Sequence, residues 1–600
     1  ITYVIIFVKL NFYRTIVKSF KDYKMMMFVV FIISVFLLTS IFTYSSMVAS
    51  DEDILIENYK QADNILSSDS LLIGKEILSR PTDKSMTIHL IPSKDIDLFI
   101  EYGDDSLNFS DKTTTYQLKK DSSYPIFINN LIPEKSYFYR ISLKDKGAAN
   151  YILRGIYQFH TAKSKSESFT FDIEADPHLD SNSIPEAYSL TLANILKDNP
   201  DFLIDLGDNF MCEKLSDKSQ INITDRHLLL RTFYEKTCHS VPLFLVLGNH
   251  EGEWGSLTEN NVKNLSILTT NTRKFYFSNP EPNSFYGGNS KIESQVGLRQ
   301  NYYSWEWGNA LFLVLDPYWY TNPKTGWGMT LGLDQYNWFK NSLRTSNAKY
   351  KFVFCHNLVG GANKDMRGGV EAADFYEWGG KDTTNIWTFN KNRQGWDKPI
   401  HQLMVDYGVS IFFHGHDHLY GYQEKDGIIY QEVPQPSNRN LTNMSAGSYG
   451  YKSGVLLPGR GYLRVTVADN ETRVEYVATL LQNEEKGQNK NGYIIHSYTV
   501  KPKPGNIEDS EENNFSIKIF PNPANGVIAI NGNITNCQDA SIEIVEASSG
   551  KLIEKFDHIP VFDNKINYSF HTSQMLLNGS YFCRIISCKS IHSTNFIINK

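Results

Sequence analysis

Three histidines in five positions follow an apolar run at residues 410–418, which read SIFFHGHDH. A buried strand of an α/β sheet presents such side chains at its carboxyl end, where open α/β sheets carry their sites. Neutral imidazole is the commonest metal ligand in proteins. His416 and His418 are therefore candidate metal ligands, although an H-x-H motif alone is a weak signal.

Four earlier segments repeat this design, in which residues that bind hard or borderline cations directly follow an apolar run. The segments are FDIEADPH with Asp176 and His178, FLIDLGDN with Asp208, LFLVLGNHE with Asn249 and His250, and KFVFCHN with His356. Chance rarely places five ligand blocks each at the end of a predicted strand. Together they predict one shared metal centre.

Helical segments separate these strands. We expect helices over residues 184–198, 224–238, 333–343 and 399–407. The alternation of strand and helix predicts βαβ units and a mostly parallel sheet. One further strand, ALFLVLD, ends in Asp316, which we interpret as a turn or supporting residue.

In order, the five blocks read D-x-H, G-D, G-N-H-E, H and G-H-x-H, and they resemble the calcineurin-like metallophosphoesterase superfamily over residues 169–478. The resemblance implies two sheets stacked between helices, and a centre of two metal ions bridged by Asp208. It assigns Asp176, His178, Asp208 and His418 to one metal, and Asp208, Asn249, His356 and His416 to the other.

The resemblance also implies the reaction. Two metal ions about 3.5–4 Å apart neutralise a phosphate ester and activate water, so we expect attack by a metal-bridging hydroxide. His250 is expected to protonate the leaving oxygen, with Glu251 orienting it. Phosphomonoesters are the expected substrates. Two alternatives are a phosphodiesterase or nucleotidase, and an inactive surface binding protein.

Several of these residues have simpler interpretations. Asp176 and Asp208 could cap the helices that follow them, and His356 could be a hydrogen-bonded core residue. His414 has two possible interpretations, a residue that supports the metal ligands and a residue that only packs in the core. Asp205 is expected to support the Asp208 loop, and Arg367 is either a substrate contact or a solvated loop residue.

The layout resembles purple acid phosphatases, with one difference at the metal. In that family a tyrosine follows the bridging aspartate by three residues, and its bond to ferric iron gives the colour. Here that position is Met211, and His178 adds a ligand where the family has glycine. We therefore expect a colourless enzyme. The ligands include no thiolate and suit Fe, Mn, Zn or Co without choosing among them.

The first residues predict export. Basic residues precede the apolar run MMMFVVFIISVFLLTSIF, and small residues follow it. Residues 1–50 thus have the pattern of a secretory signal peptide, with Met25, Met26 or Met27 as possible true starts. The alternative is an uncleaved membrane anchor, because the run is about long enough to span a bilayer.

Residues 72–163 alternate apolar and polar side chains, which predicts a β-sandwich. Leu131, Pro133 and Tyr137 have the spacing of a tyrosine corner, and the segment resembles a fibronectin type III-like domain. The metallophosphoesterase domain is expected at 167–481. Within it, 253–303 and 358–398 read as long loops that could shape substrate choice.

A polar linker is expected at 501–514. Residues 515–600 contain IKIFPNPANG and LLNGSYFCRI and resemble the C-terminal sorting domain of type IX secretion. That resemblance implies the type IX machinery as a partner, and a secreted or cell-surface protein of a Gram-negative bacterium. The alternative is an adhesion-like or merely stabilising β-sandwich.

Composition excludes little else. The net charge is −7 with no long basic block, so we expect no nucleic-acid partner, and membrane contact only through the signal peptide or surface attachment. Six cysteines are too few for a disulfide scaffold. A bridge between Cys212 and Cys238, or from Cys537 to a C-terminal partner, is conceivable.

Overall fold

The computed structural model describes residues 71–255, 264–322, 326–358 and 367–503, and in the C-terminal part 517–520, 522, 524, 526–533, 538–546, 551–561, 565–572, 576–587 and 591–598. The expected signal peptide at 1–50 and most of the expected linker lie outside these residues. The chain forms two compact units that divide between residues 503 and 504. Within the described residues, no helix is long and apolar enough to cross a membrane.

Two large sheets build the first unit, in the order β24-β23-β22-β9-β10-β11-β1-β2-β6 and β12-β15-β16-β17-β18-β20-β19-β21. The neighbouring strands β9, β10 and β11 run parallel, as do β16, β17, β18 and β20. The first sheet contains β9 Phe169–Glu174, β10 Phe202–Asp205, β11 Leu243–Leu245, β22 Gly461–Val467, β23 Thr472–Ala478 and β24 Ile494–Val500, besides the strands of the N-terminal β domain.

The second sheet contains β12 Gly287–Gly288, β15 Tyr303–Trp307, β16 Ala310–Val314, β17 Tyr350–Phe354, β18 Ile411–His414, β19 Tyr420–Lys425, β20 Ile428–Glu432 and β21 Val455–Leu457. A two-stranded ribbon, β13 Ile292–Glu293 with β14 Gly297–Leu298, stands apart from it. Phe171 and Phe202 of the first sheet meet Phe312 of the second in one aromatic core. The predicted stack of two sheets is therefore confirmed.

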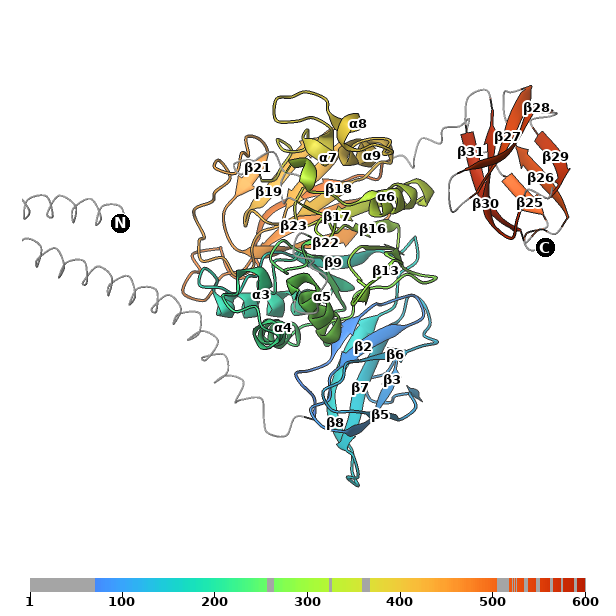
Figure 1. The fold of residues 1–600 in the computed structure, drawn as a ribbon. Helices are drawn as coiled ribbons and strands as arrows, with labels where there is room; N and C mark the ends of the chain where they lie inside the picture. The colour runs from blue at the N-terminus through green and yellow to red at the C-terminus, as the bar shows by residue number, and fades with distance from the viewer. Residues whose placement is uncertain are drawn as a thin grey trace, which may run out of the picture. The chain divides into compact units, whose positions relative to one another are not determined.

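Helices cover the outer faces of the two sheets (Figure 1). α3, α4 and α5 pack on the first sheet, and α6 and α9 pack on the second. Their bounds are α3 Pro185–Asp198, α4 Gln220–Tyr234, α5 Leu265–Tyr276, α6 Leu333–Thr345, α7 Tyr376–Gly379, α8 Phe389–Asn392 and α9 Ile400–Asp406, with short 3-10 turns η1 Cys212–Lys214 and η3 Gly326–Gly328.

Two helix predictions need correction. The helix expected at 224–238 is α4, which begins four residues earlier because the chain leaves its extended conformation at Ser219. The segment 253–303 was expected to be loop-like, but it contains α5. The threonines of α5 bury their hydroxyls by bonding carbonyls one turn back, as Thr269 does to Leu265 and Thr272 to Leu268.

The N-terminal β domain is a sandwich with its own apolar core. Its strands are β1 Ile77–Ser79, β2 Met86–Leu90, β3 Ile96–Gly103, β4 Asp111–Lys112, β5 Tyr116–Leu118, β6 Tyr124–Ile128, β7 Ser136–Asp145 and β8 Ile152–His160. The tyrosine corner is confirmed, since the Tyr137 hydroxyl accepts a hydrogen bond from the Ile132 amide at 2.9 Å.

The β domain shares a sheet with the catalytic strands, because β1 pairs in parallel with β11 at Ser79 and Leu243. Buried Arg231 of α4 reinforces this junction. Its guanidinium donates hydrogen bonds to the carbonyls of Lys75, His89 and Tyr276.

The second unit is a small β-sandwich with a continuous apolar core. Its sheets have the orders β25-β26-β29 and β28-β27-β30-β31. The strands are β25 Ile517–Phe520, β26 Val527–Asn533, β27 Asp539–Glu546, β28 Leu552–Pro560, β29 Lys565–His571, β30 Gly579–Ile586 and β31 Ile591–Ile598.

The described cysteines are free. Cys212 and Cys238 lie buried as thiols, so the conceivable bridge between them is not formed. Cys355 and Cys583 are also buried and free, while Cys537 and Cys588 lie outside the described residues.

Candidate metal centre

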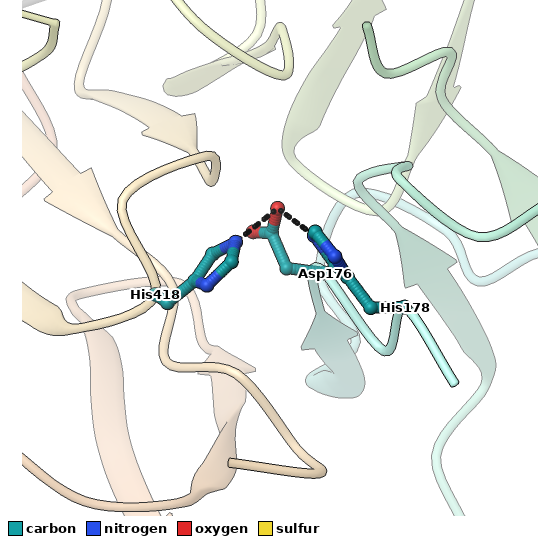
Figure 2. A group of neighbouring side chains, drawn as sticks. All are labelled: Asp176, His178 and His418. Carbon is teal, nitrogen blue, oxygen red and sulfur yellow. Dashed lines mark ion pairs between the residues drawn. The ribbon is translucent and has the colours of Figure 1, made fainter. Parts of the chain in front are cut away.

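Loops from both sheets bring one group of three candidate ligands together. Asp176 and His178 follow β9, and His418 follows β18; their ligand atoms all lie within 4.8 Å of one another. Figure 2 shows the Asp176 carboxylate between the two imidazole rings, with Oδ1 3.5 Å from His178 Nε2 and 3.4 Å from His418 Nε2. Ligand atoms about 2.1 Å from a tetrahedral ion lie about 3.4 Å apart, so the spacing fits a cation.

A second group contains Asp208, His356 and His416, which follow β10, β17 and β18. Asp208 Oδ2 lies 3.2 Å from His356 Nε2 and 3.6 Å from His178 Nε2. This one carboxylate oxygen therefore faces both groups, as a bridging ligand must.

Hydrogen bonds from neighbouring loops fix how these side chains point. The second oxygen of each aspartate accepts a backbone N–H at 2.8 Å, Asp176 from His416 and Asp208 from His250. His356 Nδ1 lies 2.8 Å from the Leu206 carbonyl, which can only accept, so Nδ1 is the donor. The lone pair of neutral His356 then lies on Nε2, the nitrogen that faces Asp208.

Buried polar atoms without hydrogen-bond partners lie at the same two groups of side chains. Buried polar atoms are nearly always hydrogen-bonded, yet several atoms here have no hydrogen-bond partner among the described residues. They are Asp176 Oδ1, His178 Nε2, Asn249 Oδ1, His356 Nε2 and His416 Nδ1. Carboxylate, amide and imidazole atoms left without partners at one point fit metal ions, which would supply the missing contacts.

The backbone is strained at these positions. A positive φ is uncommon outside glycine and costs about 1–3 kcal/mol in a side-chain-bearing residue. Several candidate ligands have it, namely Asp176 at 60°, His178 at 54°, Asp208 at 58°, His416 at 84° and His418 at 59°. Strain of this kind persists where the surrounding structure imposes it, and it concentrates at functional sites.

Two glycines let neighbouring ligand loops touch. A Cβ on Gly207 would lie 2.4 Å from the Gly248 amide nitrogen, and one on Gly248 would lie 2.3 Å from the Asp208 amide nitrogen. The loops after β10 and β11 therefore meet backbone to backbone, which brings Asn249 toward Asp208.

The electrostatics favour cations. Burial would raise the pKa of Asp176 and of Asp208, but the adjacent histidines outweigh it and hold both pKa values below their usual range. Burial would lower the pKa of His356, but Asp208 and Asp176 outweigh it and raise that pKa to about 10. Both carboxylates are thus ionised although they are buried, where their charge is weakly screened.

His250 lies beside Asp208 and is 23 % exposed, with Nε2 3.9 Å from Asp208 Oδ2. Burial lowers its pKa to about 4, even though Asp208 opposes the shift. Glu251, expected to orient His250, instead accepts the backbone N–H groups of Asn209 and Gly248, each at 2.6 Å.

The carboxylate that faces the His250 ring is Glu213, with Oε2 3.8 Å from Nδ1. Sequence reasoning did not single out Glu213, because its approach to His250 depends on the turn that follows Met211. Trp254 Nε1 donates to this carboxylate at 3.1 Å.

Arg367 supports the loop that carries His416. Its guanidinium donates to the His416 carbonyl at 2.7 Å, pairs with Asp417 at 3.0 Å and stacks on the Tyr449 ring. These contacts favour a supporting role for Arg367.

The remaining supporting residues lie deeper. His414 Nδ1 lies 2.5 Å from Glu432 Oε2. Asp205 accepts hydrogen bonds from Gly207 N, Asn209 Nδ2 and Tyr234 OH, as its expected supporting role requires. Asp316 pairs with Arg299 at 2.9 Å, within the turn after β16.

Family models match two parts of the chain. Residues 169–420 match the calcineurin-like phosphoesterase family, and residues 518–599 match the secretion system C-terminal sorting domain. The chain therefore carries a calcineurin-like phosphoesterase domain, the domain of a phosphoester hydrolase with a dinuclear metal centre. The sorting domain is characteristic of secreted or cell-surface proteins.

Two solved structures are similar to this chain at low sequence identity, and the first of them shares the fold. PhoD is 14 % identical, with a TM-score of 0.53 over 73 % of this chain and 92 % of its own. The purple acid phosphatase PPD1 from yellow lupin (Lupinus luteus) seeds is 15 % identical, with a TM-score of 0.48 over 71 % of this chain and 74 % of its own. No curated protein matches the chain.

Proposed function

We propose that the chain is an exported, binuclear metal-dependent phosphatase that hydrolyses phosphomonoesters. The observation that carries this proposal is the convergence of candidate ligand atoms from the loops after both sheets, several of which have no hydrogen-bond partner among the described residues. The matched phosphoesterase family supports the reaction class.

In this proposal Asp176, His178 and His418 hold one metal ion, and Asn249, His356 and His416 hold the other. Asp208 Oδ2 faces both groups and is the bridging ligand. When bound, two metal ions neutralise phosphate charge and lower the pKa of water, which supplies a nucleophile.

His250 acts on the leaving group. The ring lies beside Asp208 and is partly exposed, so that it can donate a hydrogen bond or a proton to the ester oxygen. A bound phosphate dianion would raise the pKa of His250 and favour its protonated form.

The metals are expected to be Fe, Mn, Zn or Co, because the donors are oxygen and imidazole nitrogen. Met211 stands where a purple enzyme has its tyrosine. The iron-loaded protein should therefore show no tyrosinate charge-transfer band in its visible spectrum. A purple or pink protein would contradict this expectation.

Features near both ends of the chain support export. The matched sorting domain supports delivery by type IX secretion to the surface or medium of a Gram-negative bacterium. The apolar run near the start supports a preceding signal peptide. Mass spectrometry of the exported protein should find both ends removed.

The test of the catalytic proposal combines metal analysis with two substrates. The purified chain should contain about two metal ions and should hydrolyse an aryl phosphomonoester faster than the matching bis-aryl diester. A chelator should abolish both activities, and added metal should restore them. Preference for the diester would favour a phosphodiesterase, and inactivity after reconstitution would favour a surface binding protein.

A further inference from the structure

Lys214 ends the short turn η1, which the structure holds at the edge of the metal centre. The preceding residue Met211 has φ of 51°, and the Lys214 amide donates to the Met211 carbonyl at 3.1 Å. The Glu213 amide donates to the His250 carbonyl at 3.2 Å. The turn is therefore tied directly to the loop that carries His250.

The Lys214 ammonium lies near Asp180, which in turn faces His178 of the centre. Its Nζ is 3.7 Å from Asp180 Oδ2, and the same oxygen is 3.6 Å from His178 Nδ1. The rings of His178 and His250 lie 5.8 Å apart. Lys214 thus projects at the rim on the side where these two rings meet.

Among the described residues, two other cations around the centre bond protein carbonyls or carboxylates. Arg367 bonds the His416 carbonyl, and Arg439 donates to the Ser183 carbonyl at 3.2 Å. Lys214 differs in two ways, since its contact with Asp180 is longer than a hydrogen bond and its side chain is 43 % exposed. Such an ammonium can turn toward a ligand at little cost.

We propose that Lys214 binds the non-bridging oxygens of the substrate phosphate and thereby favours dianionic phosphomonoesters over monoanionic diesters. This inference rests on the proposed phosphatase function. A monoester carries about one more negative charge than a diester at neutral pH, so an added cation stabilises the monoester more. The negative groups beside Lys214, Asp180 and Glu213, weaken its attraction for phosphate without cancelling it.

The test compares Lys214→Gln and Lys214→Glu with Lys218→Gln. Lys218 lies four residues further on, is exposed, and donates to the Leu215 carbonyl at 2.9 Å, so its variant makes the same charge change away from the centre. We expect kcat/KM for an aryl phosphomonoester to fall about tenfold in Lys214→Gln and further in Lys214→Glu. The diester rate and the Lys218→Gln enzyme should change less than about threefold.

Binding of inorganic phosphate to the metal-loaded protein, measured by calorimetry, tests Lys214 separately from catalysis. Its Kd should rise about tenfold in Lys214→Gln, with unchanged metal content and an unchanged thermal midpoint. Equal losses on both esters, or unchanged phosphate binding, would overturn the inference. If the unmodified protein cleaves neither ester, the proposed function fails, while the phosphate Kd still decides the role of Lys214.

Discussion

Individual candidate ligands combine backbone strain with missing hydrogen bonds. Asp176 combines a left-handed backbone with a carboxylate oxygen that lacks a hydrogen-bond partner in the described chain. Both features cost folding free energy in the metal-free protein. Metal ions that bind only the folded state would offset these costs and stabilise the protein.

His250→Ala tests the leaving-group role. We expect kcat for an alkyl phosphomonoester to fall about 10²–10³-fold, since a positioned acid contributes on this scale. An aryl ester, whose leaving group needs less help, should lose less. Metal content should stay unchanged, because His250 is not a proposed ligand. Full turnover of the alkyl ester by the variant would remove this role.

The candidate ligands could be predicted because each directly follows an apolar strand, and parallel strands bring their carboxyl ends together. The role of Glu213 could not be predicted from the sequence, since its approach to His250 depends on the turn after Met211. The positive φ values could not be predicted either, because a positive φ is uncommon in any single non-glycine residue, even though aspartate and histidine adopt it more often than most.

At the level of elements, the loops after parallel strands carry the candidate ligands. Close backbone contacts between these loops determine how far apart the candidate ligands lie. Helices with an apolar stripe were predictable, as α3 and α6 show. α5 was missed because its buried face contains threonines and Arg273, which pairs with buried Glu253 at 2.6 Å. A buried ion pair between residues 20 positions apart cannot be recognised from the local hydrophobic pattern.

Gly248→Ala should separate two ligand loops. The new Cβ would lie 2.4 Å from Asp208 Oδ1, so the loops after β10 and β11 must move apart. We expect metal affinity to fall about 10–100-fold, measured by competition with a chromophoric chelator. Gly447→Ala is the matched control, because its Cβ would meet nothing within 4 Å. Equal affinities in the two variants would refute this account.

His227 of α4 should make stability depend on pH. It stacks on Phe210 with ring centroids 4.0 Å apart, and burial lowers its pKa to about 4. In the unfolded chain that pKa is about 6.5. The stability contributed by neutral His227 is therefore present above about pH 6.5 and is lost as the pH falls through 4.

His227→Phe keeps a stacked ring that cannot titrate. Between about pH 7 and 4.5, the free energy of unfolding should fall by about 2–3 kcal/mol more in the unmodified protein than in the variant. Urea unfolding with chelator present in both proteins measures this difference, and other groups titrate equally in the two. Parallel pH profiles would show that His227 is not responsible.

At the level of the whole molecule, the N-terminal β domain and the phosphoesterase domain are joined by a shared sheet. Ser79 of β1 pairs with Leu243 of β11, and Arg231 donates across the same junction. The C-terminal β-sandwich is a separate compact unit.

Two truncations should behave differently. Removal of residues 504–600 should leave the thermal midpoint and metal content unchanged. Removal of residues 1–166 should abolish the cooperative transition, because it exposes the edge of β11 and the buried charge of Arg231. Calorimetry of both truncated proteins provides the comparison. A stable, metal-loaded protein that begins at 167 would show that the two domains are independent.

The order of strands in the first sheet also sets when the protein can fold. β9 carries Asp176 on its following loop, yet Ile173 of β9 pairs with Leu463 of β22, near the far end of the unit. Pairing between such distant segments is slow, because the chain loses the entropy of loop closure before the contacts between the strands can stabilise it. This sheet therefore cannot close until nearly the whole unit has been synthesised.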